Sequence, residues 1–295
     1  MKKKLMAAAM AAVMTVAVQA PAFAATSDPN MTAYLTDYTT TVSAGTEETV
    51  YLMAVPADAY YSPTSFDSEA DAADVAWSVV PGSTTGVSVD EDSIMGMDMG
   101  DGTIAAYAEV NVAADAAPGA ASIEAKNPET GATMNYTVVV NGTDTAKNNI
   151  TYRFYNGDDE LLTVSNMSVA GTDYYGNTSY PSVLDGVLKV WQTTQRSDKQ
   201  LLYPTVTNNY GTYAVESMTF RQVNADGSYT DTPPLTNYTD ETTWDYYGWQ
   251  YRVYRNGTIV PLSELIGADE CALQSGDTVV WKFGQYGVVD FDDTL

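Results

Sequence analysis

The sequence predicts a mainly β protein, in which a β-sandwich is followed by an α+β domain with one helix on an antiparallel sheet. Short β-rich segments separated by clusters of glycine, proline, asparagine and aspartate run through the first half, a pattern typical of sandwiches. In the second half, residues 179–194 repeat apolar side chains at helical spacing between further β-rich segments. Four of the five tryptophans also stand in the second half, so the two halves differ in composition.

The first residues resemble an export signal. Three lysines precede an apolar run over residues 5–18 and an Ala-Phe-Ala triplet at 22–24, which is the order of a secretory signal peptide. The alternative is a membrane helix, but the run is shorter than the ~20 residues that a bilayer span needs. We therefore predict a signal peptide over residues 1–24 and a secreted mature protein, extracellular or periplasmic, without a membrane span.

The mature chain is strongly acidic. The whole sequence has 13 basic and 38 acidic residues, and the leader holds three lysines and no acids. Residues 25–295 therefore carry 13 − 3 = 10 basic residues and a net charge of 10 − 38 = −28. Such a surface repels the phosphate backbone, so we expect no nucleic-acid partner. The charge favours solubility and does not by itself identify a partner.

The sequence contains no histidine and one cysteine, Cys271. The lack of histidine excludes Ser-His and Cys-His nucleophilic sites and every metal site with a histidine ligand. One thiol forms no internal disulfide, so we expect Cys271 to be buried, with pairing to another chain as the alternative. Acids stand at the end of every predicted strand, so no pair is singled out for glycoside hydrolysis. We expect no enzymatic activity and no cofactor.

The first predicted domain covers residues 25–145. Its strands are expected at residues 49–57, 74–82, 86–92, 103–114, 121–127 and 134–142. In the second of these, Val75, Trp77 and Val79 alternate with small or polar residues, so they share one face. Trp77 is the expected anchor of the core, because large rings dominate burial in small sandwiches.

The order of these segments resembles bacterial immunoglobulin-like domains. A Gly-Thr turn before a strand, a V-x-W strand, a V-x-V-D strand, a Pro-Gly turn and a final T-V-V-V strand carry the resemblance over residues 31–141. It implies an immunoglobulin-like β-sandwich. Two segments depart from the pattern: an insertion at residues 59–74, and the sequence Met-Gly-Met-Asp-Met-Gly at 95–100, which we expect to form a loop.

The second predicted domain covers residues 146–295 and follows a polar, turn-rich linker at 141–149. Its helix is predicted from the recurring side chains of Val183, Leu184, Val187, Leu188 and Trp191. Ser179 is the expected cap, with Pro181 in the first turn. Gly186 weakens a helix by ~1 kcal/mol relative to alanine, which indicates a close packing contact there. Strands are expected over 150–169, with a turn at Asn156-Gly157, and over 210–223, 244–257 and 277–285.

Residues 244–257 read WDYYGWQYRVYRNG and concentrate two tryptophans and four tyrosines. Because neighbouring strand residues face opposite sides, the segment divides into two rows. The row expected in the core is Tyr247, Trp249, Tyr251 and Val253. The row expected to be amphipathic, with its aromatic end available for contact, is Trp244, Tyr246, Gln250, Arg252 and Tyr254. Asn256-Gly257 predicts a tight hairpin turn.

Four motifs in order resemble a second family. They are YPSVLDGVLKV, YGTYAVESM, the aromatic strand ending in Asn-Gly, and a Ser-Gly-Asp turn before TVVWKF. Over residues 148–287 the chain is similar to the C-terminal β domain of transcobalamin and intrinsic factor, a type that recurs in bacterial secreted proteins. In cobalamin carriers this domain closes over one face of the corrinoid against a helical barrel. That barrel is absent here, so the resemblance implies the fold more strongly than the ligand.

The resemblance implies a binding protein with a corrinoid or a similar flat, amphipathic small molecule as its ligand. The ligand-binding residues it implies are Trp244, Tyr246, Tyr247 and Trp249. The alternative is a cell-surface or secreted interaction module, because tryptophan and tyrosine platforms also suit the stacking of glycans or contact with another protein. Acidic clusters at residues 90–101 and 224–228 raise the question of calcium, but neither fits the twelve-residue loop pattern, so we expect no metal site.

Overall fold

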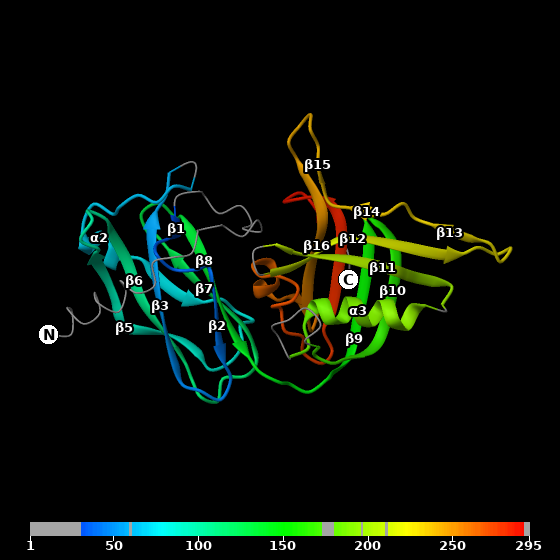
Figure 1. The fold of residues 1–295 in the computed structure, drawn as a ribbon, viewed down its shortest axis with the longest axis horizontal. Coiled ribbons are helices and arrows are strands. Elements are labelled where there is room, and N and C mark those ends of the chain that lie inside the picture. Colours follow the sequence, from blue (N-terminus) through cyan, green and yellow to red (C-terminus); the bar gives the residue numbers. More distant parts are fainter. Residues whose placement is uncertain (1–30, 59–60, 173–179, 196, 210–211, 292–295) are drawn as a thin grey trace.

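The structure is a computed structural model that describes residues 31–291 with the exception of 59–60, 173–179, 196 and 210–211. The leader predicted over residues 1–24 lies outside the described residues. The described chain forms two lobes (Figure 1), and the predicted mainly β class is confirmed. Neither helix of the described residues combines the length and the apolar character that a membrane crossing requires.

The first lobe contains two four-stranded sheets. Its described strands are β1 (Met31–Ala33), β2 (Thr39–Ser43), β3 (Glu48–Pro56), β4 (Ala76–Val79), β5 (Val87–Asp98), β6 (Ile104–Val112), β7 (Gly119–Lys126) and β8 (Thr133–Asn141). One sheet has the order β1-β3-β6-β5 and the other β2-β8-β7-β4, with β2 parallel to β8. Apart from β2, this is the strand order of a constant-type immunoglobulin sandwich. Kinship with that family stays a prediction.

Trp77 lies in the core of the first lobe, as predicted, and its ring stacks on Tyr136 at 6.1 Å between centroids. The loop expected at residues 95–100 is wrong, because β5 continues through Met95 and Met97 to Asp98. The short helix α2 (Glu69–Ala73), inside the predicted insertion, explains the difference. A side chain at Gly96 would lie 1.9 Å from the carbonyl oxygen of Glu69, so only glycine lets α2 pack directly on the strand.

The second lobe combines two sheets with one long helix. Its described elements are β9 (Lys147–Asn156), β10 (Asp159–Val169), α3 (Val183–Thr194), β11 (Lys199–Asn209), β12 (Thr212–Val223), β13 (Tyr229–Asp231), β14 (Leu235–Thr236), β15 (Tyr238–Thr239), β16 (Tyr246–Arg255), β17 (Thr258–Ile259), the 3-10 helix η1 (Pro261–Glu264) and β18 (Thr278–Gln285). The larger sheet has the order β10-β9-β18-β16-β15, and the smaller one joins β11, β12 and β13. Strands β9 and β18 are parallel, so the larger sheet is mixed rather than purely antiparallel.

Helix α3 begins one turn later than predicted. The Ser182 hydroxyl accepts a hydrogen bond from the Asp185 backbone N–H at 3.2 Å, and the Asp185 carboxylate accepts one from the Ser182 N–H at 2.9 Å. This reciprocal pair is a capping box. It replaces the cap predicted at Ser179, which lies outside the described residues, and it leaves Pro181 ahead of the helix.

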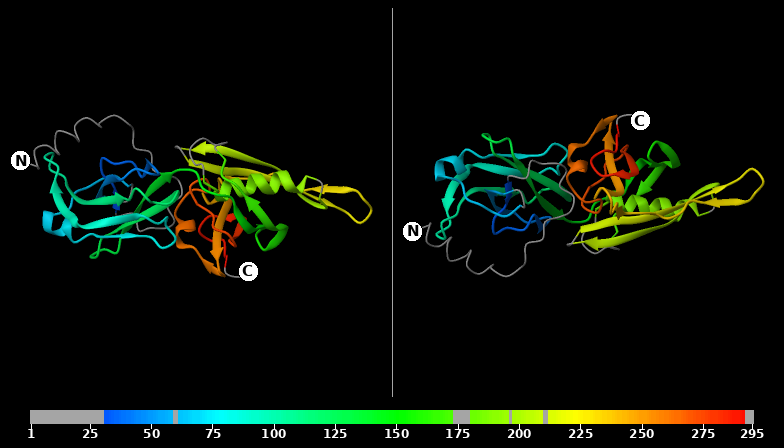
Figure 2. Two further views of the ribbon diagram at one scale, coloured as in Figure 1. Left: turned by 90° about the horizontal axis from the view of Figure 1, so that it is seen from below. Right: turned by 90° about the horizontal axis from the view of Figure 1, so that it is seen from above.

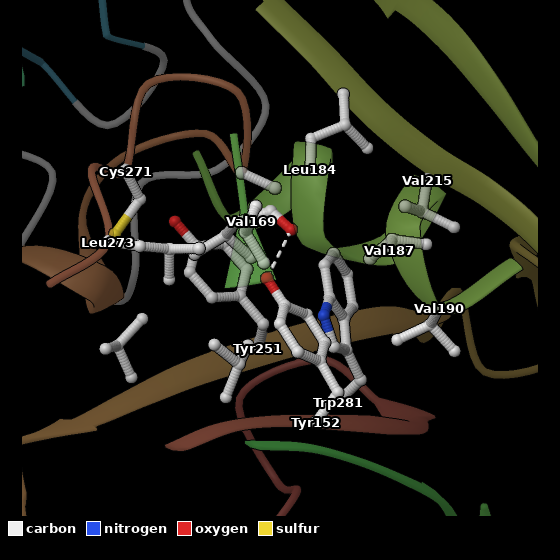
Figure 3. Close-up of a cluster of buried hydrophobic side chains, with 14 of the residues drawn as sticks. Tyr152, Val169, Leu184, Val187, Val190, Val215, Tyr251, Cys271, Leu273 and Trp281 are labelled. Carbon is white, nitrogen blue, oxygen red and sulfur yellow. Dashed lines mark hydrogen bonds between the residues drawn. The ribbon is translucent and has the colours of Figure 1, made fainter. Parts of the chain in front are cut away.

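Gly186 makes the close contact that its position in the helix indicates. A Cβ atom there would lie 1.9 Å from the hydroxyl oxygen of Tyr152 on β9. That hydroxyl donates to the carbonyl of Val183 at 2.7 Å, so the tyrosine reaches from the sheet to the first turn of the helix (Figure 3). The glycine lets helix and sheet approach closely enough for this bond.

The two lobes pack against each other. Ala120 and Val139 of the first lobe belong to the same apolar cluster as Val260 and Leu262 of the second. The Leu262 N–H donates to the Pro81 carbonyl at 3.3 Å. Figure 2 shows the lobes side by side from below and above, with the β12–β13 hairpin at the end away from the first lobe. One face of the second lobe is therefore covered by the first lobe. The predicted ligand-binding residues have to lie on a face that the first lobe leaves uncovered.

Candidate functional site

The predicted contact residues lie on β16 and in the turn before it, within a hairpin of β15 and β16 that projects beyond the body of the second lobe (Figure 1). Its turn spans residues 240–245 and is ordered by Asp240. The Asp240 carboxylate accepts from the Thr242 N–H at 2.7 Å and the Thr243 N–H at 3.3 Å, and these bonds hold the pKa of Asp240 below its usual range. The Asp240 carbonyl also accepts from the Trp244 N–H at 2.7 Å, which closes the turn.

Trp244 occupies the end of this turn with its side chain in solvent. It is 79% exposed, and its φ of +62° lies in the left-handed region that a bulky residue rarely adopts. Such backbone strain persists where the surrounding bonds determine it, and it is concentrated at functional positions. The turn thus holds an indole ring away from the protein.

Four tyrosines flank this tryptophan in two pairs. Tyr238 on β15 lies opposite Tyr247 on β16, and their rings stack at 4.9 Å between centroids with an interplanar angle of 3°. Tyr246, which is 38% exposed, tilts against Tyr286 with the centroids 5.9 Å apart. Sequence reasoning missed Tyr238 and Tyr286. The two-residue strand β15 is too short to show periodicity, and Tyr286 follows the last predicted strand.

Trp249 has a different place from the other three predicted ligand-binding residues. It is 6% exposed, its ring meets Phe283 edge-on at 5.5 Å, and its Nε1 donates to the Leu235 carbonyl at 2.9 Å. The row assignment is confirmed for Trp249, Tyr251 and Val253, which all lie in the core. The ring and the N–H of Trp249 both have partners inside the protein, so the ligand contact implied for it stays a prediction and Trp249 lies outside the exposed surface.

The outer row of β16 is exposed only near the turn. Gln250 and Tyr254 are buried, and the Tyr254 hydroxyl donates to the Phe291 carbonyl at 2.7 Å. Tyr155, Val280 and Phe291 form a small apolar cluster with Tyr254. The C-terminal segment therefore covers the far end of the row, and Trp244 and Tyr246 are its exposed members.

The end of the hairpin presents neutral rings beside carboxylates. Loss of solvent raises the pKa of Tyr246 and that of Tyr247. The negative charges of Asp245 and Asp240 raise the pKa of Tyr247 further. Both phenols therefore stay protonated and can donate or accept hydrogen bonds. The surface combines flat apolar faces with acceptors for hydroxyl groups.

A cleft lies further down β16, between that strand and residues 263–268. Tyr213, Gln250, Arg252, Ile266 and Trp281 are among the residues that line it, and its cavity volume is about 60 Å³. Pockets for small-molecule ligands usually measure ~300–1,000 Å³. The cleft has room for a few water molecules, and a corrinoid ring does not fit into it.

Comparison with known proteins gives no relative: the chain matches no family model, no curated protein and no solved structure. The two resemblances noted in the sequence therefore stay predictions.

The acidic clusters use their oxygens to bind the backbone next to them. Asp90, Asp98 and Asp101 each accept a hydrogen bond from the backbone N–H two residues further on, and Asp226 does the same with Ser228. Within the described part of the chain, no group of three or more histidine, cysteine, aspartate or glutamate side chains is arranged to hold a metal ion. These carboxylates therefore stabilise the local backbone conformation.

Titratable groups with shifted pKa values gather in the loop that packs against the start of α3. Burial raises the pKa of Asp269 to about 6, that of Glu270 to about 7 and that of the Cys271 thiol to about 12. The loop is tied to the helix, because the Val183 N–H donates to the Cys271 carbonyl at 3.0 Å. Cys271 is buried, as expected. The cluster lies inside the fold, where it affects stability.

Proposed function

We propose that the protein is a secreted, non-enzymatic binding protein that holds its ligand on the aromatic tip of the β15–β16 hairpin. The aromatic tip is defined as Tyr238, Trp244, Tyr246, Tyr247 and Tyr286. The observation that carries the proposal is Trp244, a tryptophan 79% exposed on an ordered turn that projects from the lobe. Exposed tryptophan and tyrosine side chains are the residues that most often anchor a partner. The leader-like residues 1–24 support export.

We propose glycans as the ligand class, with surface attachment or interaction as the role. The apolar face of a sugar ring stacks on an aromatic ring, and its hydroxyl groups donate to carboxylates such as Asp240 and Asp245 beside the rings. The tip is an open ridge, which suits an extended chain better than an enclosed small molecule. The net charge of the mature protein disfavours anionic glycans, so the ligand is expected to be neutral.

The second candidate is a corrinoid, which the resemblance over residues 148–287 supports. Its flat, amphipathic ring would have to lie on the open aromatic tip, because the cleft of about 60 Å³ beside β16 is too small. The two candidates share the contact residues and differ in the ligand.

The test is a neutral-glycan array followed by titration of the best ligand, with cobalamin and cobinamide as the competing arm. We expect Trp244→Ala to weaken binding at least tenfold, which corresponds to about 1.4 kcal/mol. Its melting temperature should match that of the wild type, because the ring makes little contact with the protein. Tyr203→Ala is the control, since Tyr203 is an aromatic residue on β11 that is 50% exposed and lies outside the aromatic tip.

Binding of a corrinoid alone would replace the glycan proposal with the second candidate. The proposed binding surface itself would be contradicted if neither the glycans nor the corrinoids bound at millimolar ligand concentration. Equal ligand affinity of the wild type and Trp244→Ala would contradict it as well.

A further inference from the structure

Strand β16 has a short stretch of open edge beside the cleft. On one side β16 pairs with β18. On the other side β15 pairs with the start of β16 and β17 pairs with its end. Among the described strands, none pairs with residues 248–253 on this second side. The cleft lies along this edge, between β16 and residues 263–268.

The backbone groups along this edge point toward the cleft. The Trp249 N–H donates to Asn237 Oδ1 at 3.1 Å, and the Val253 N–H donates to Ser263 Oγ at 3.0 Å. Both N–H groups are therefore turned away from β18. In an antiparallel ladder the N–H and C=O of every second residue point to the same side. The N–H and C=O of Tyr251, midway between these two residues, point to that side as well.

Tyr251 thus presents a backbone donor in the cleft. Its N–H has no acceptor among the side chains and loop carbonyls that the structure describes. A shielded N–H without a partner costs free energy, so an acceptor from a ligand is favourable there. The Tyr251 C=O already accepts from Nη1 of Arg252 at 2.8 Å, and Nε of Arg252 lies 2.9 Å from a Glu264 carboxylate oxygen. This ion pair leaves the cleft without net charge, which suits a neutral acceptor.

Acceptors stand on the facing wall of the cleft. The carbonyls of Ile266 and Gly267 accept from the Tyr251 hydroxyl at 2.8 and 3.1 Å, and each carbonyl oxygen has a second lone pair. The side chains of Val215 and Trp281 add apolar surface. The cleft therefore combines a donor on one wall, acceptors on the other and an apolar lining.

An acetamido group matches this lining in size and polarity. The cavity of about 60 Å³ admits roughly four or five water-sized groups, because each needs about 10–15 Å³. The carbonyl of an acetamido group can accept from the Tyr251 N–H. Its own N–H points the opposite way and can donate to the facing wall, while its methyl group packs on the apolar lining.

The cleft adjoins the aromatic tip through Tyr286, which belongs to the tip and also lines the cleft. We propose that the cleft binds the acetamido group of an N-acetylated amino sugar, within the neutral glycan that the aromatic tip holds. The inference rests on the proposed function, because the tip supplies the contacts to the rest of the glycan. A peptide fits the edge less well, since strand addition uses several backbone groups and the N–H groups of Trp249 and Val253 already have partners.

The experiment compares two neutral tetrasaccharides with the same linkage. Chitotetraose carries an acetamido group on each sugar, and cellotetraose carries a hydroxyl group at the same position. Calorimetric titration should show about tenfold tighter binding of chitotetraose, the effect of a few net hydrogen bonds. In ¹⁵N-labelled protein, chitotetraose should move the amide signal of Tyr251. The amide signal of Val253, whose N–H is already bonded to Ser263, is the control and should stay in place.

The variant Ala214→Leu narrows the cleft. Ala214 is half-buried on β12 and lies in the cleft wall. The added carbons should remove the preference for chitotetraose and leave the affinity for cellotetraose unchanged. Ala76→Leu, the same change at an exposed position on β4, is the matched control and should keep the tenfold preference.

Equal affinity of the wild type for the two tetrasaccharides, with the Tyr251 signal unmoved, would overturn the acetamido site. The aromatic tip would survive that result if Trp244→Ala still weakened both ligands. A shift of Tyr251 with equal chitotetraose affinity in the wild type and Trp244→Ala would support the cleft and contradict the tip. If neither tetrasaccharide bound, the acetamido site would be overturned, and the glycan array would decide the tip separately. The Tyr251 signal is measured in the wild type, so it decides even where Ala214→Leu fails to fold.

Discussion

The two lobes solve the same packing problem with different side chains. Among the buried residues that the structure describes, the main core of the first lobe contains nine alanines and three aromatic rings. The main core of the second contains eight aromatic rings and, apart from Ala120 of the first lobe, one alanine. The first brings two sheets together across small residues. The second fills the wider space between a sheet, a helix and a second sheet with rings such as those of Phe154, Phe220 and Trp281.

This difference in core composition determines which kind of core substitution destabilises each lobe most. Cores are packed closely, so removal of a large ring leaves a cavity and enlargement of a small residue forces its neighbours apart. The second lobe should therefore be sensitive to truncation and the first to enlargement. Buried carboxylates add a second contrast, because Asp185, Glu270 and Asp277 all belong to the second lobe, and the described part of the first has none.

The largest effect is expected for Trp249→Ala. The substitution removes the ring that packs between Phe220 and Phe283 and deletes the donor to the Leu235 carbonyl. We expect the free energy of unfolding to fall by about 4 kcal/mol, the usual cost of truncating a large buried ring. Urea unfolding followed by far-ultraviolet circular dichroism measures it. The control Trp244→Ala should stay within ~0.5 kcal/mol of the wild type, and equal losses in both variants would contradict the separate roles of the two tryptophans.

The buried acid Glu270 should make the second lobe less stable at neutral than at acidic pH. Its pKa is raised by burial from 4.5 to about 7, so its protonated form is favoured in the folded state. The stability it contributes is complete below pH ~4.5 and is lost as the pH rises through ~7. A shift of this size corresponds to roughly 3 kcal/mol. Glu270→Gln keeps a neutral side chain, and it should exceed the wild type by about that amount at pH 8 and match it at pH 4.

Asp269→Asn provides a matched variant for the pH experiment. Burial raises the pKa of Asp269 from 3.8 to about 6, so its loss of stability should fall between pH ~4 and ~6, in a window that overlaps that of Glu270 but ends at a lower pH. Chemical denaturation at pH 4, 6 and 8 shows whether stability is still lost above pH 6, where only Glu270 contributes. Identical pH profiles for the wild type and Glu270→Gln would show that the carboxyl group is accommodated without this cost.

Residues with strong local patterns predict the fold well, and residues fixed by distant contacts do not. The expected strands at 49–57, 103–114 and 134–142 match β3, β6 and β8 to within about two residues at each end. Their alternation and flanking turns are local signals. Strand β11 is not predicted, because Pro204 interrupts a largely polar segment that reads as a loop. It becomes a strand through its pairing with β12.

The candidate site follows the same rule. Alternation along β16 correctly separates the buried row of Trp249 from the row of Trp244, because both depend on the period of one strand. Burial of Tyr254 depends instead on Phe291, 37 residues further along the chain. The partner of Tyr247 is a tyrosine on a two-residue strand. Nothing near residue 250 in the sequence indicates either contact.

Enlargement of a core alanine tests the opposite sensitivity of the first lobe. Ala108 lies on β6 with no exposed surface, between the two sheets. Ala108→Leu should lower the free energy of unfolding by about 2 kcal/mol, because the added carbons force neighbouring side chains out of their rotamers. The control Ala76→Leu alters an exposed residue on β4 and should have little effect. If Ala108→Leu left the free energy of unfolding unchanged, the sheets of the first lobe would have to move apart easily. That result would contradict the close packing inferred from its alanines.

The smallest difference concerns a motif that both lobes share. Ser68 caps α2 and Ser182 caps α3, each with an aspartate three residues later. Ser182→Ala should cost about 1 kcal/mol, the typical value for a lost helix cap, because Ser182 and Asp185 are buried and water does not replace the missing hydroxyl. Ser68→Ala should cost less, because α2 has five residues and its cap is partly open to solvent. Thermal unfolding of the two variants compares the caps directly. A larger loss for Ser68→Ala would mean that α2, packed on Gly96, contributes more to its lobe than the length of the helix suggests.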